Sequence, residues 1–277
     1  MEKIIVPIDF SEYSEFALKA AALLSKKVPV EIYALHMLDL QEVNMSQTSS
    51  YSQEKGIYFL KLAEQKFKKF LQKDFLKEAK VVPVIKHYKV FSEVNAIAKE
   101  INADLIIMGS HGASGLKEFF TGSNTEKVIR YSEVPVLILK NELKDIDFTE
   151  IVFATDFSEE TIPAYNRMLA SLEFLGAKMH LLFVNLPNEK FKTTPEMDTL
   201  ANNFLMSAEG NVDRLINVNF VCAKTVEDGI LSFSNLVGAD LIALITHGRK
   251  GLAHVFSGSI SEDISNHSAL PIMTFKI

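Results

Sequence analysis

Three glycines and two polar residues near the middle of the chain have the types and the spacing to hold an anion. Gly109 and Gly112 lie at the end of the apolar run DLIIM, and Gly122, Ser123 and Asn124 follow after nine intervening residues. Glycine lets the backbone approach a ligand without a Cβ in the way, and the free amides at a helix start attract negative charge. The spacing fits a cradle for ribose and phosphates, and it also fits a plain loop whose glycines supply positive φ angles.

Several better-known motifs for phosphate binding and catalysis are absent from the sequence. The P-loop pattern G-x-x-x-x-G-K-[ST] does not occur, and the apolar run KIIVPI leads into the tripeptide DFS rather than into the dinucleotide fingerprint. The HxGH and SGGxDS motifs of adenylyl transfer are missing as well. His111, His247 and His254 do not form a set of three or four convergent ligands, so no metal site is predicted.

Apolar residues alternate between strand-like and helix-like spacing, which predicts the elements that must position these residues. We expect strands at residues 3–8, 30–38, 81–90, 104–109 and 135–140, and helices at 14–27, 52–79, 93–102 and 122–132. Strands that alternate with helices favour a parallel sheet covered on both faces, and ligands of such sheets bind beyond the carboxyl ends of the strands. The glycine cluster begins at one of these ends.

The chain contains this pattern twice. IIVPIDFSE at 4–12 matches IVFATDFSE at 151–159, and HGxxGLxxxFxGSxxE occurs at 111–126 and again at 247–262. We therefore predict two tandem domains, residues 1–142 and 148–277, joined by a short polar linker. Each is predicted to be an α/β domain with a doubly wound, Rossmann-like sheet of five parallel strands.

Composition narrows the class of protein. The 277 residues are 48% hydrophobic, and the formal net charge is -6, which argues against a nucleic-acid partner. No segment approaches the ~18 consecutive apolar residues of a membrane span, and the N-terminus does not read as a signal peptide. The single cysteine, Cys222, lies in the apolar run VNFVC, where we expect a small buried side chain in a reducing compartment. We therefore expect a cytoplasmic protein.

The ordered set of motifs resembles the universal stress protein family. Its ATP-binding pattern is G-x2-G-x9-G-[ST] after the fourth strand, which Gly109, Gly112, Gly122 and Ser123 match. The early PIDFS, the ALHML after the second strand and the closing VPVLIL resemble that family too, and both copies take part. The resemblance implies an adenine nucleotide alpha hydrolase-like fold and ATP as the ligand, with Mg²⁺ bridging its phosphates.

The resemblance also implies a role for individual residues. Asp9, in the turn after Pro7, would accept a hydrogen bond from the adenine or the adjacent ribose, or would only cap the turn into the first helix. Met37 and Met108 would line the adenine slot, although core packing explains them equally well. The three glycines, Ser123 and Asn124 would contact ribose and phosphates.

The second copy departs from the family pattern at its first glycine. Ile245 stands where the first copy has Gly109, and a β-branched side chain there should crowd the path of ribose and phosphate. We expect weak or absent nucleotide binding in this copy. Its retained residues, which are weak candidates for a second site, are Asp156, Gly248, Gly258 and Ser259.

Three functions remain open at this point. The first is a nucleotide-dependent regulatory protein of the stress response, and the second is a slow ATPase, for which Lys117 and Lys127 are candidates by proximity only. The third is a scaffold for a different small ligand, such as a lipid fragment or a cyclic nucleotide. The resemblance further implies pairing through the last strands, PVLILK and PIMTFK, which would make an internal pseudo-dimer. A homodimer of two such chains is compatible with the same pairing.

Overall fold

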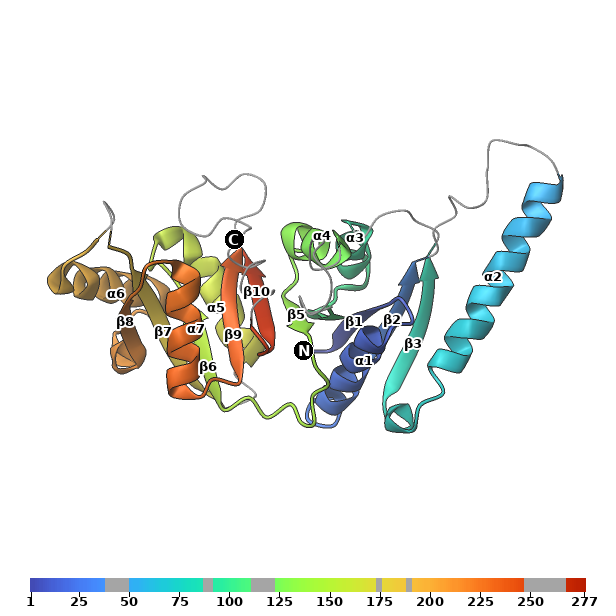
Figure 1. The fold of residues 1–277 in the computed structure, drawn as a ribbon, viewed down its shortest axis with the longest axis horizontal. Helices are drawn as coiled ribbons and strands as arrows, with labels where there is room; N and C mark the ends of the chain where they lie inside the picture. Colours follow the sequence, from blue (N-terminus) through green and yellow to red (C-terminus); the bar gives the residue numbers. More distant parts are fainter. Residues whose placement is uncertain (38–49, 87–91, 111–122, 173–175, 188–190, 247–267) are drawn as a thin grey trace.

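The structure is a computed structural model, which describes residues 1–37, 50–86, 92–110, 123–172, 176–187, 191–246 and 268–277. The ten strands within these ranges form one sheet in the order β3-β2-β1-β4-β5-β10-β9-β6-β7-β8. Figure 1 follows the chain from the blue and green first half (residues 1–142) to the yellow and red second half (residues 148–277), with β5 and β10 in the middle. The chain is therefore a mixed α/β protein with a mostly parallel sheet, as predicted.

The helices and strands of each half keep the predicted alternation. In the first half they are β1 Lys3–Ile8, α1 Glu12–Ser25, β2 Glu31–Met37, α2 Ser50–Phe70, β3 Lys80–Lys86, α3 Ser92–Ile101, β4 Leu105–Gly109, α4 Ser123–Tyr131 and β5 Val136–Leu139. In the second half they are β6 Glu150–Ala154, α5 Ile162–Leu172, β7 Lys178–Asn185, α6 Thr194–Glu209, β8 Val218–Cys222, α7 Val226–Val237, β9 Leu241–Thr246 and β10 Ile272–Lys276.

The strand order places a switch point in each half. β1 pairs in parallel with β2 on one side and with β4 on the other, so the chain winds outward from β1 in both directions. β6 has the same position between β7 and β9. Ligands of open α/β sheets bind at such a point, beyond the carboxyl ends of the strands. Among the described strand pairs, only β5 and β10 are antiparallel, and there Ile138 lies opposite Ile272.

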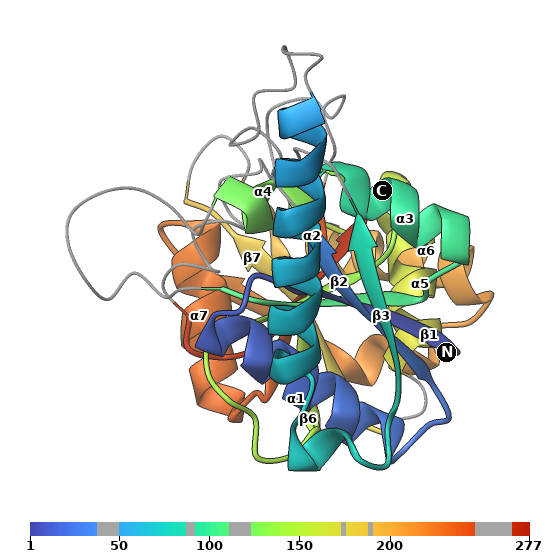
Figure 2. The same ribbon diagram turned by 90° about the vertical axis from the view of Figure 1, so that its right-hand side faces the viewer.

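The strand residues alternate between two apolar layers, as expected for a sheet that is covered on both faces. On one face α1 and α2 cover side chains such as Ile107 and Leu139, and in the second half α5 and α6 cover the same layer. On the other face α3, α4 and α7 cover side chains such as Met108 and Ile138. Figure 2 shows α2 running alongside β2 and β3 at the outer end of the sheet.

The helix α2 is shorter than the sequence predicts. It ends at Phe70 rather than near residue 79, and a 3₁₀ turn at Asp74–Leu76 follows before β3 begins. No glycine or proline follows Phe70 to end the helix. The residues after it instead make contacts with other parts of the fold. Leu76 is buried in the turn, and Lys73 is paired with Glu15 of α1 at 2.7 Å.

The expectation of a buried Cys222 is wrong, because the residue is exposed. It ends β8, which is the outermost strand of the sheet on that side. An edge strand has a neighbour on one side only, so an apolar run there does not imply burial. The periodicity of VNFVC identifies a strand without revealing its place in the sheet.

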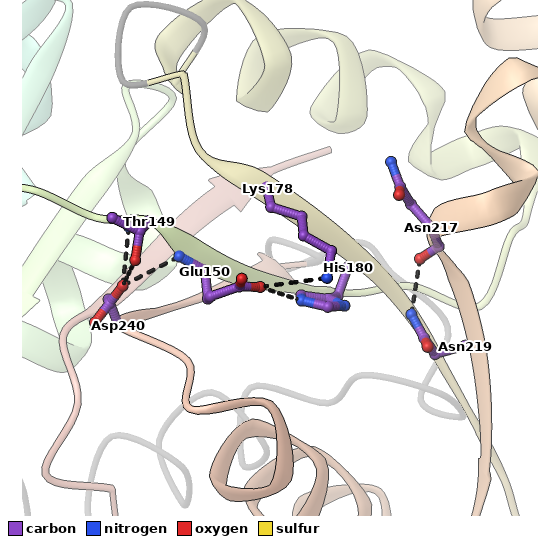
Figure 3. A network of polar contacts seen from close by, with 7 residues as sticks. All are labelled: Thr149, Glu150, Lys178, His180, Asn217, Asn219 and Asp240. Atoms are coloured by element: carbon purple, nitrogen blue, oxygen red, sulfur yellow. Dashed lines mark hydrogen bonds and ion pairs between the residues drawn. The ribbon is translucent and has the colours of Figure 1, made fainter.

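A repeated aspartate fastens the start of the first strand in each half. Asp104 Oδ2 accepts hydrogen bonds from the backbone of Glu2 at 2.6 Å and of Lys3 at 3.0 Å. In the second half Asp240 Oδ2 accepts from Thr149 N, Thr149 Oγ1 and Glu150 N at 2.9, 2.7 and 3.1 Å (Figure 3). The repeated ADLI motif is thus explained by the architecture of the sheet, at the edge opposite to the carboxyl ends.

The two halves use opposite charges at one matching cross-strand pair. Lys3 of β1 lies opposite Glu31 of β2, whereas Glu150 of β6 lies opposite Lys178 of β7. Glu150 Oε2 and Lys178 Nζ are 3.9 Å apart, and the same carboxylate contacts the buried His180 Nε2 (Figure 3). Both halves therefore place opposite charges at this position of the sheet, with the order of the charges reversed.

Candidate functional site

The turn after β1 in the first half is held by Asp9 and Ser11. Asp9 Oδ1 accepts hydrogen bonds from Ser11 N at 2.9 Å and from Ser11 Oγ at 2.5 Å. Ser11 Oγ in turn accepts from Ser14 N at 3.2 Å, so Ser11 caps α1, a position that favours serine. Burial raises the pKa of the Asp9 carboxyl, but the hydrogen bonds from Ser11 and Ser14 outweigh it and leave the pKa below its ordinary value. The carboxylate is therefore ionised at neutral pH.

Phe10 and His36 form a half-buried aromatic group beneath this turn. Phe10 has a φ of 67°, a left-handed conformation that is uncommon for a residue with a side chain. Its ring centroid lies 4.3 Å from that of His36 and 6.1 Å from that of Phe67, and Lys66 Nζ lies 4.4 Å from its centre. The strained turn thus brings groups from β1, β2 and α2 together at the carboxyl edge of the sheet.

His36 is fixed in one orientation by the backbone. Its Nδ1 lies 2.8 Å from the carbonyl oxygen of Ile8, which can only accept, so Nδ1 carries the proton. Burial, helped by the charge of Lys66, lowers the pKa of the imidazole, while the Ile8 hydrogen bond and the charge of Asp9 oppose that shift. The net pKa lies below the ordinary value, so His36 is neutral above about pH 6.5.

Gly109 has no side chain because α1 occupies that space. A Cβ added at Gly109 would lie 2.0 Å from the carbonyl oxygen and 2.3 Å from the carbonyl carbon of Tyr13. The first turn of α1 therefore rests directly on the last residue of β4. The sequence suggests that a ligand approaches the backbone closely at Gly109. In the structure the backbone of α1 makes a close approach of this kind at the Cα of Gly109.

Ser110 follows Gly109 and is buried, with 2% of its surface exposed. Its backbone N–H donates to the carbonyl of Leu139 at 2.8 Å, but its hydroxyl has no hydrogen-bond partner in the described part of the chain. A buried polar group without a partner costs about 1–3 kcal/mol, so it needs an explanation.

The other candidates of the first half divide into described and undescribed positions. Pro7 is buried in β1, Met108 is buried in β4, and Met37 is half-buried at the end of β2 and packs on the same apolar layer as Met108. Ser123 and Asn124 are the first two residues of α4. The strand order places the ends of β1, β2 and β4 side by side, which brings Asp9, Met37 and Gly109 to one edge of the sheet. Gly112 and Gly122 lie outside the described residues.

The matching turn of the second half is similar in its backbone and different in its surroundings. Asp156 Oδ1 accepts from Ser158 N at 2.9 Å, and Phe157 has a φ of 56°. Phe157, however, packs on Phe183 at 6.1 Å and on Phe204 at 5.3 Å between ring centroids. Phe183 stands where the first half has His36, so the second half has an apolar group where the first half has a polar one.

The helix start and the strand end also differ between the halves. A 3₁₀ turn, Glu159–Thr161, precedes α5, whereas α1 begins directly at Glu12. Ile245 is completely buried in the apolar layer that α5 and α6 cover. The second half therefore starts its first helix differently from the first half. The side chain of Ile245 occupies the space that the backbone of α1 occupies beside Gly109. Gly248, Gly258 and Ser259 lie outside the described residues.

Two features of the site were missed by sequence reasoning. His36 stands within ALHML, but nothing in that run indicates that its ring would lie under Phe10. Lys140 is the last residue of PVLILK, and the sequence indicates only that it belongs to a pairing strand. Among the described residues, no group of three His, Cys, Asp or Glu side chains is arranged to hold a metal ion, so Mg²⁺ would have to be held largely by the phosphates of a ligand. No helix among those residues has the length and the apolar character to span a membrane.

The fold and the site define a protein with two copies of a doubly wound α/β domain, and comparison with known proteins gives the family. The family model of the universal stress protein family matches residues 1–140 and again residues 147–276. The chain therefore belongs to the universal stress protein family and carries two of its domains in tandem.

Individual relatives agree with this assignment. Universal stress protein MJ0577 of Methanocaldococcus jannaschii is 32% identical over 161 residues, which cover 51% of this chain and 96% of that protein. Universal stress protein Slr1230 of Synechocystis is 23% identical over 298 residues and covers 100% of both chains. The crystal structure of a universal stress protein from Archaeoglobus fulgidus superposes with a TM-score of 0.67 at 24% identity, over 99% of this chain and 98% of that one. That likeness supports the fold of the whole tandem.

Proposed function

We propose that this protein is a nucleotide-dependent regulatory protein of the stress response that binds ATP mainly in its first half. The difference between the two switch points carries this proposal. The first half presents an ionised Asp9 and a neutral His36 around the Phe10 turn, whereas the second half packs Phe157 against Phe183 and Phe204. Polar groups at a switch point can recognise a nucleoside, while an aromatic cluster is part of a core.

The described residues of the first half fit an adenine nucleotide. Met37 and Met108 offer an apolar lining beside the polar turn, and the buried hydroxyl of Ser110 is unpartnered among the described residues. Asp9 accepts both hydrogen bonds from Ser11 at Oδ1, and an ionised carboxylate can accept a further one from a ligand. We assign the nucleotide-contacting roles to these residues and to Ser123 and Asn124 at the start of α4.

We further propose that residues 1–142 and 148–277 act as the two members of an internal pseudo-dimer. The antiparallel pairing of Thr274 with Val136 and of Met273 with Leu137 supports this arrangement. The second half would then serve as a structural partner whose own pocket has been filled. Regulation would follow if ATP stabilises this assembly, because a ligand that binds the folded state raises its stability.

Calorimetric titration of the full chain with Mg-ATP tests the proposal. We expect one site per chain. We expect Asp9→Asn to weaken binding by about tenfold, because a charged acceptor is lost. The matched variant Asp156→Asn should leave the affinity unchanged. Two equivalent sites, or equal losses in the two variants, would contradict the asymmetry, and the absence of any binding would rule out the ATP function.

A further inference from the structure

Lys140 is a partly buried cation that lacks a described counter-ion. It follows β5, and it makes no ion pair or hydrogen bond with any residue that the structure describes. Two other lysines of the first half with partly buried side chains have a carboxylate partner: Lys19 pairs with Glu142, and Lys73 pairs with Glu15. Desolvation alone lowers the pKa of the Lys140 ammonium to about 8. A charge in such a place is unfavourable unless an anion joins it.

Lys276, the equivalent residue of the second half, has a different environment. Its Nζ donates to the carbonyl of Tyr131 at 3.5 Å, at the carboxyl end of α4. Cations at that end of a helix are stabilised by its dipole. Lys276 therefore has a structural partner across the β5–β10 pairing, which makes it a suitable control for Lys140.

Ser110 and Lys140 are neighbours at the carboxyl edge of the sheet. Gly109 of β4 lies beside Leu139 of β5 in the parallel register, so the next residues along the two strands are Ser110 and Lys140. Met108 and Ile138, two positions earlier, both face the apolar layer under α3 and α4. Ser110 and Lys140 lie one residue past the ends of β4 and β5. Because side chains alternate along a strand, we infer that these two continue the alternation and lie on that same side.

We propose that Ser110 and Lys140 together bind a phosphoryl group. One anion would give both groups the partner that they lack among the described residues. The Ser110 hydroxyl would donate a hydrogen bond to a phosphoryl oxygen, and the Lys140 ammonium would pair with the negative charge of the phosphoryl group. The place is the end of β4 and β5, next to the switch point between β1 and β4. This assignment rests on the proposed function only for the source of the phosphoryl group, which there is the terminal phosphate of ATP.

The site also lies next to the junction of the halves. The antiparallel register that sets Ile138 opposite Ile272 places Lys140 opposite Leu270, two residues before β10 begins. Asn141 Nδ2, one residue further, donates to the carbonyl of Ala269 at 3.5 Å. A phosphoryl group held by Lys140 would therefore be bound where the two halves meet.

Titration of four variants with ATP and AMP tests this assignment. Lys140→Met and Ser110→Ala each remove one proposed contact, and both leave an apolar replacement that should fold. We expect each to weaken ATP binding by about tenfold and to leave AMP binding within about twofold, because AMP lacks the terminal phosphates. Lys276→Met and Ser234→Ala are the matched controls, since they remove the equivalent lysine and another buried unpartnered hydroxyl, and neither should alter ATP binding.

A second arm uses inorganic phosphate as the probe and follows the lysine side-chain carbons by NMR. A shift of the Lys140 resonance on addition of phosphate, lost in Ser110→Ala, supports the site even if the chain binds no ATP, in which case only the proposed function fails. The assignment is overturned if ATP affinity stays within about twofold of wild type in both variants, or if the Lys140 resonance responds to neither phosphate nor ATP.

Discussion

Gly109 shows how a single missing side chain can serve the fold. Its Cα faces the carbonyl of Tyr13, so the first turn of α1, with Ser11 and Asp9 at its start, is set by the close contact with β4. Ile245 at the matching position needs a different helix entry, which the 3₁₀ turn before α5 supplies. A Gly109→Ile variant would therefore disturb α1 as well as any ligand, and it is a poor control for binding.

We predict that Gly109→Ala destabilises the protein. The new methyl group would lie 2.0 Å from the Tyr13 carbonyl oxygen, and backbone cannot rotate away as a flexible side chain can. Overpacking of this kind costs about 1–3 kcal/mol. Urea unfolding followed by circular dichroism measures the loss. An unchanged unfolding midpoint would show that α1 does not rest on Gly109.

We predict that Lys140→Met is more stable than wild type at pH 7, in buffer without phosphate, and that the gap closes at high pH. Burial lowers the pKa of Lys140 from an ordinary 10.5 to about 8, so between these values the unfolded chain holds a proton that the folded chain has released. The free energy of unfolding of wild type should therefore rise with pH across this window relative to the variant. Urea titrations at intervals from pH 7 to 10.5 check this, and a gap independent of pH would contradict it.

The helices α3 and α7 occupy equivalent places but differ in how well they fit the sheet. Ser234 of α7 is buried, and its hydroxyl has no partner among the described residues, while Ala98 fills the same position of α3. α7 also lies very close to its sheet, because a Cβ at Gly229 would meet the Val184 side chain at 2.6 Å. The second half thus packs tightly on this face and buries the Ser234 hydroxyl, which makes no hydrogen bond with the described residues that would stabilise the fold.

We predict that Ser234→Ala stabilises the protein by about 1 kcal/mol, since it removes an unsatisfied buried hydroxyl and reproduces the alanine of α3. Ser232→Ala is the control, because the Ser232 hydroxyl is exposed and donates to the Asp228 carbonyl at 2.5 Å. That change should alter the free energy of unfolding by less than about 0.5 kcal/mol. A loss of stability in Ser234→Ala would indicate that the hydroxyl has a partner.

The elements themselves could largely be predicted from the sequence, because apolar periodicity records which face of each strand and helix is buried. The parallel sheet of each half follows from its alternation with helices, whereas the order of the strands does not, and the Ser11 cap follows from residue type. The end of α2 at Phe70 could not be predicted, because the turn that follows it buries Leu76 and brings Lys73 to Glu15 of α1, and local residue types do not reveal such distant contacts. The surroundings of His36, Ser110 and Lys140 were equally hidden, because they depend on which side chains from distant segments lie nearby.

At the scale of the whole molecule, one sheet runs through both halves. β5 and β10 join them, and the apolar layer under α1 and α2 continues into the layer under α5 and α6. Apolar packing and strand pairing therefore cross the midpoint of the chain. A change in the stability of one half should be felt by the other.

We predict a single cooperative unfolding transition by differential scanning calorimetry. Ser234→Ala, which lies in the second half, should raise the Tm of the whole transition rather than split it. If instead two endotherms appear and the variant moves only one, the β5–β10 pairing would be too weak to couple the halves.

The reversed charge pairs have a consequence for how a duplicated chain sorts itself during folding. Lys3 belongs opposite Glu31, and Glu150 belongs opposite Lys178. If β1 were to add to β7, two lysines would meet, and if β6 were to add to β2, two glutamates would meet, so each wrong partnership is repelled at its first residue. Tandem repeats are prone to exchange strands between copies. The reversed charges would therefore favour strand pairing within each copy over pairing between the two copies.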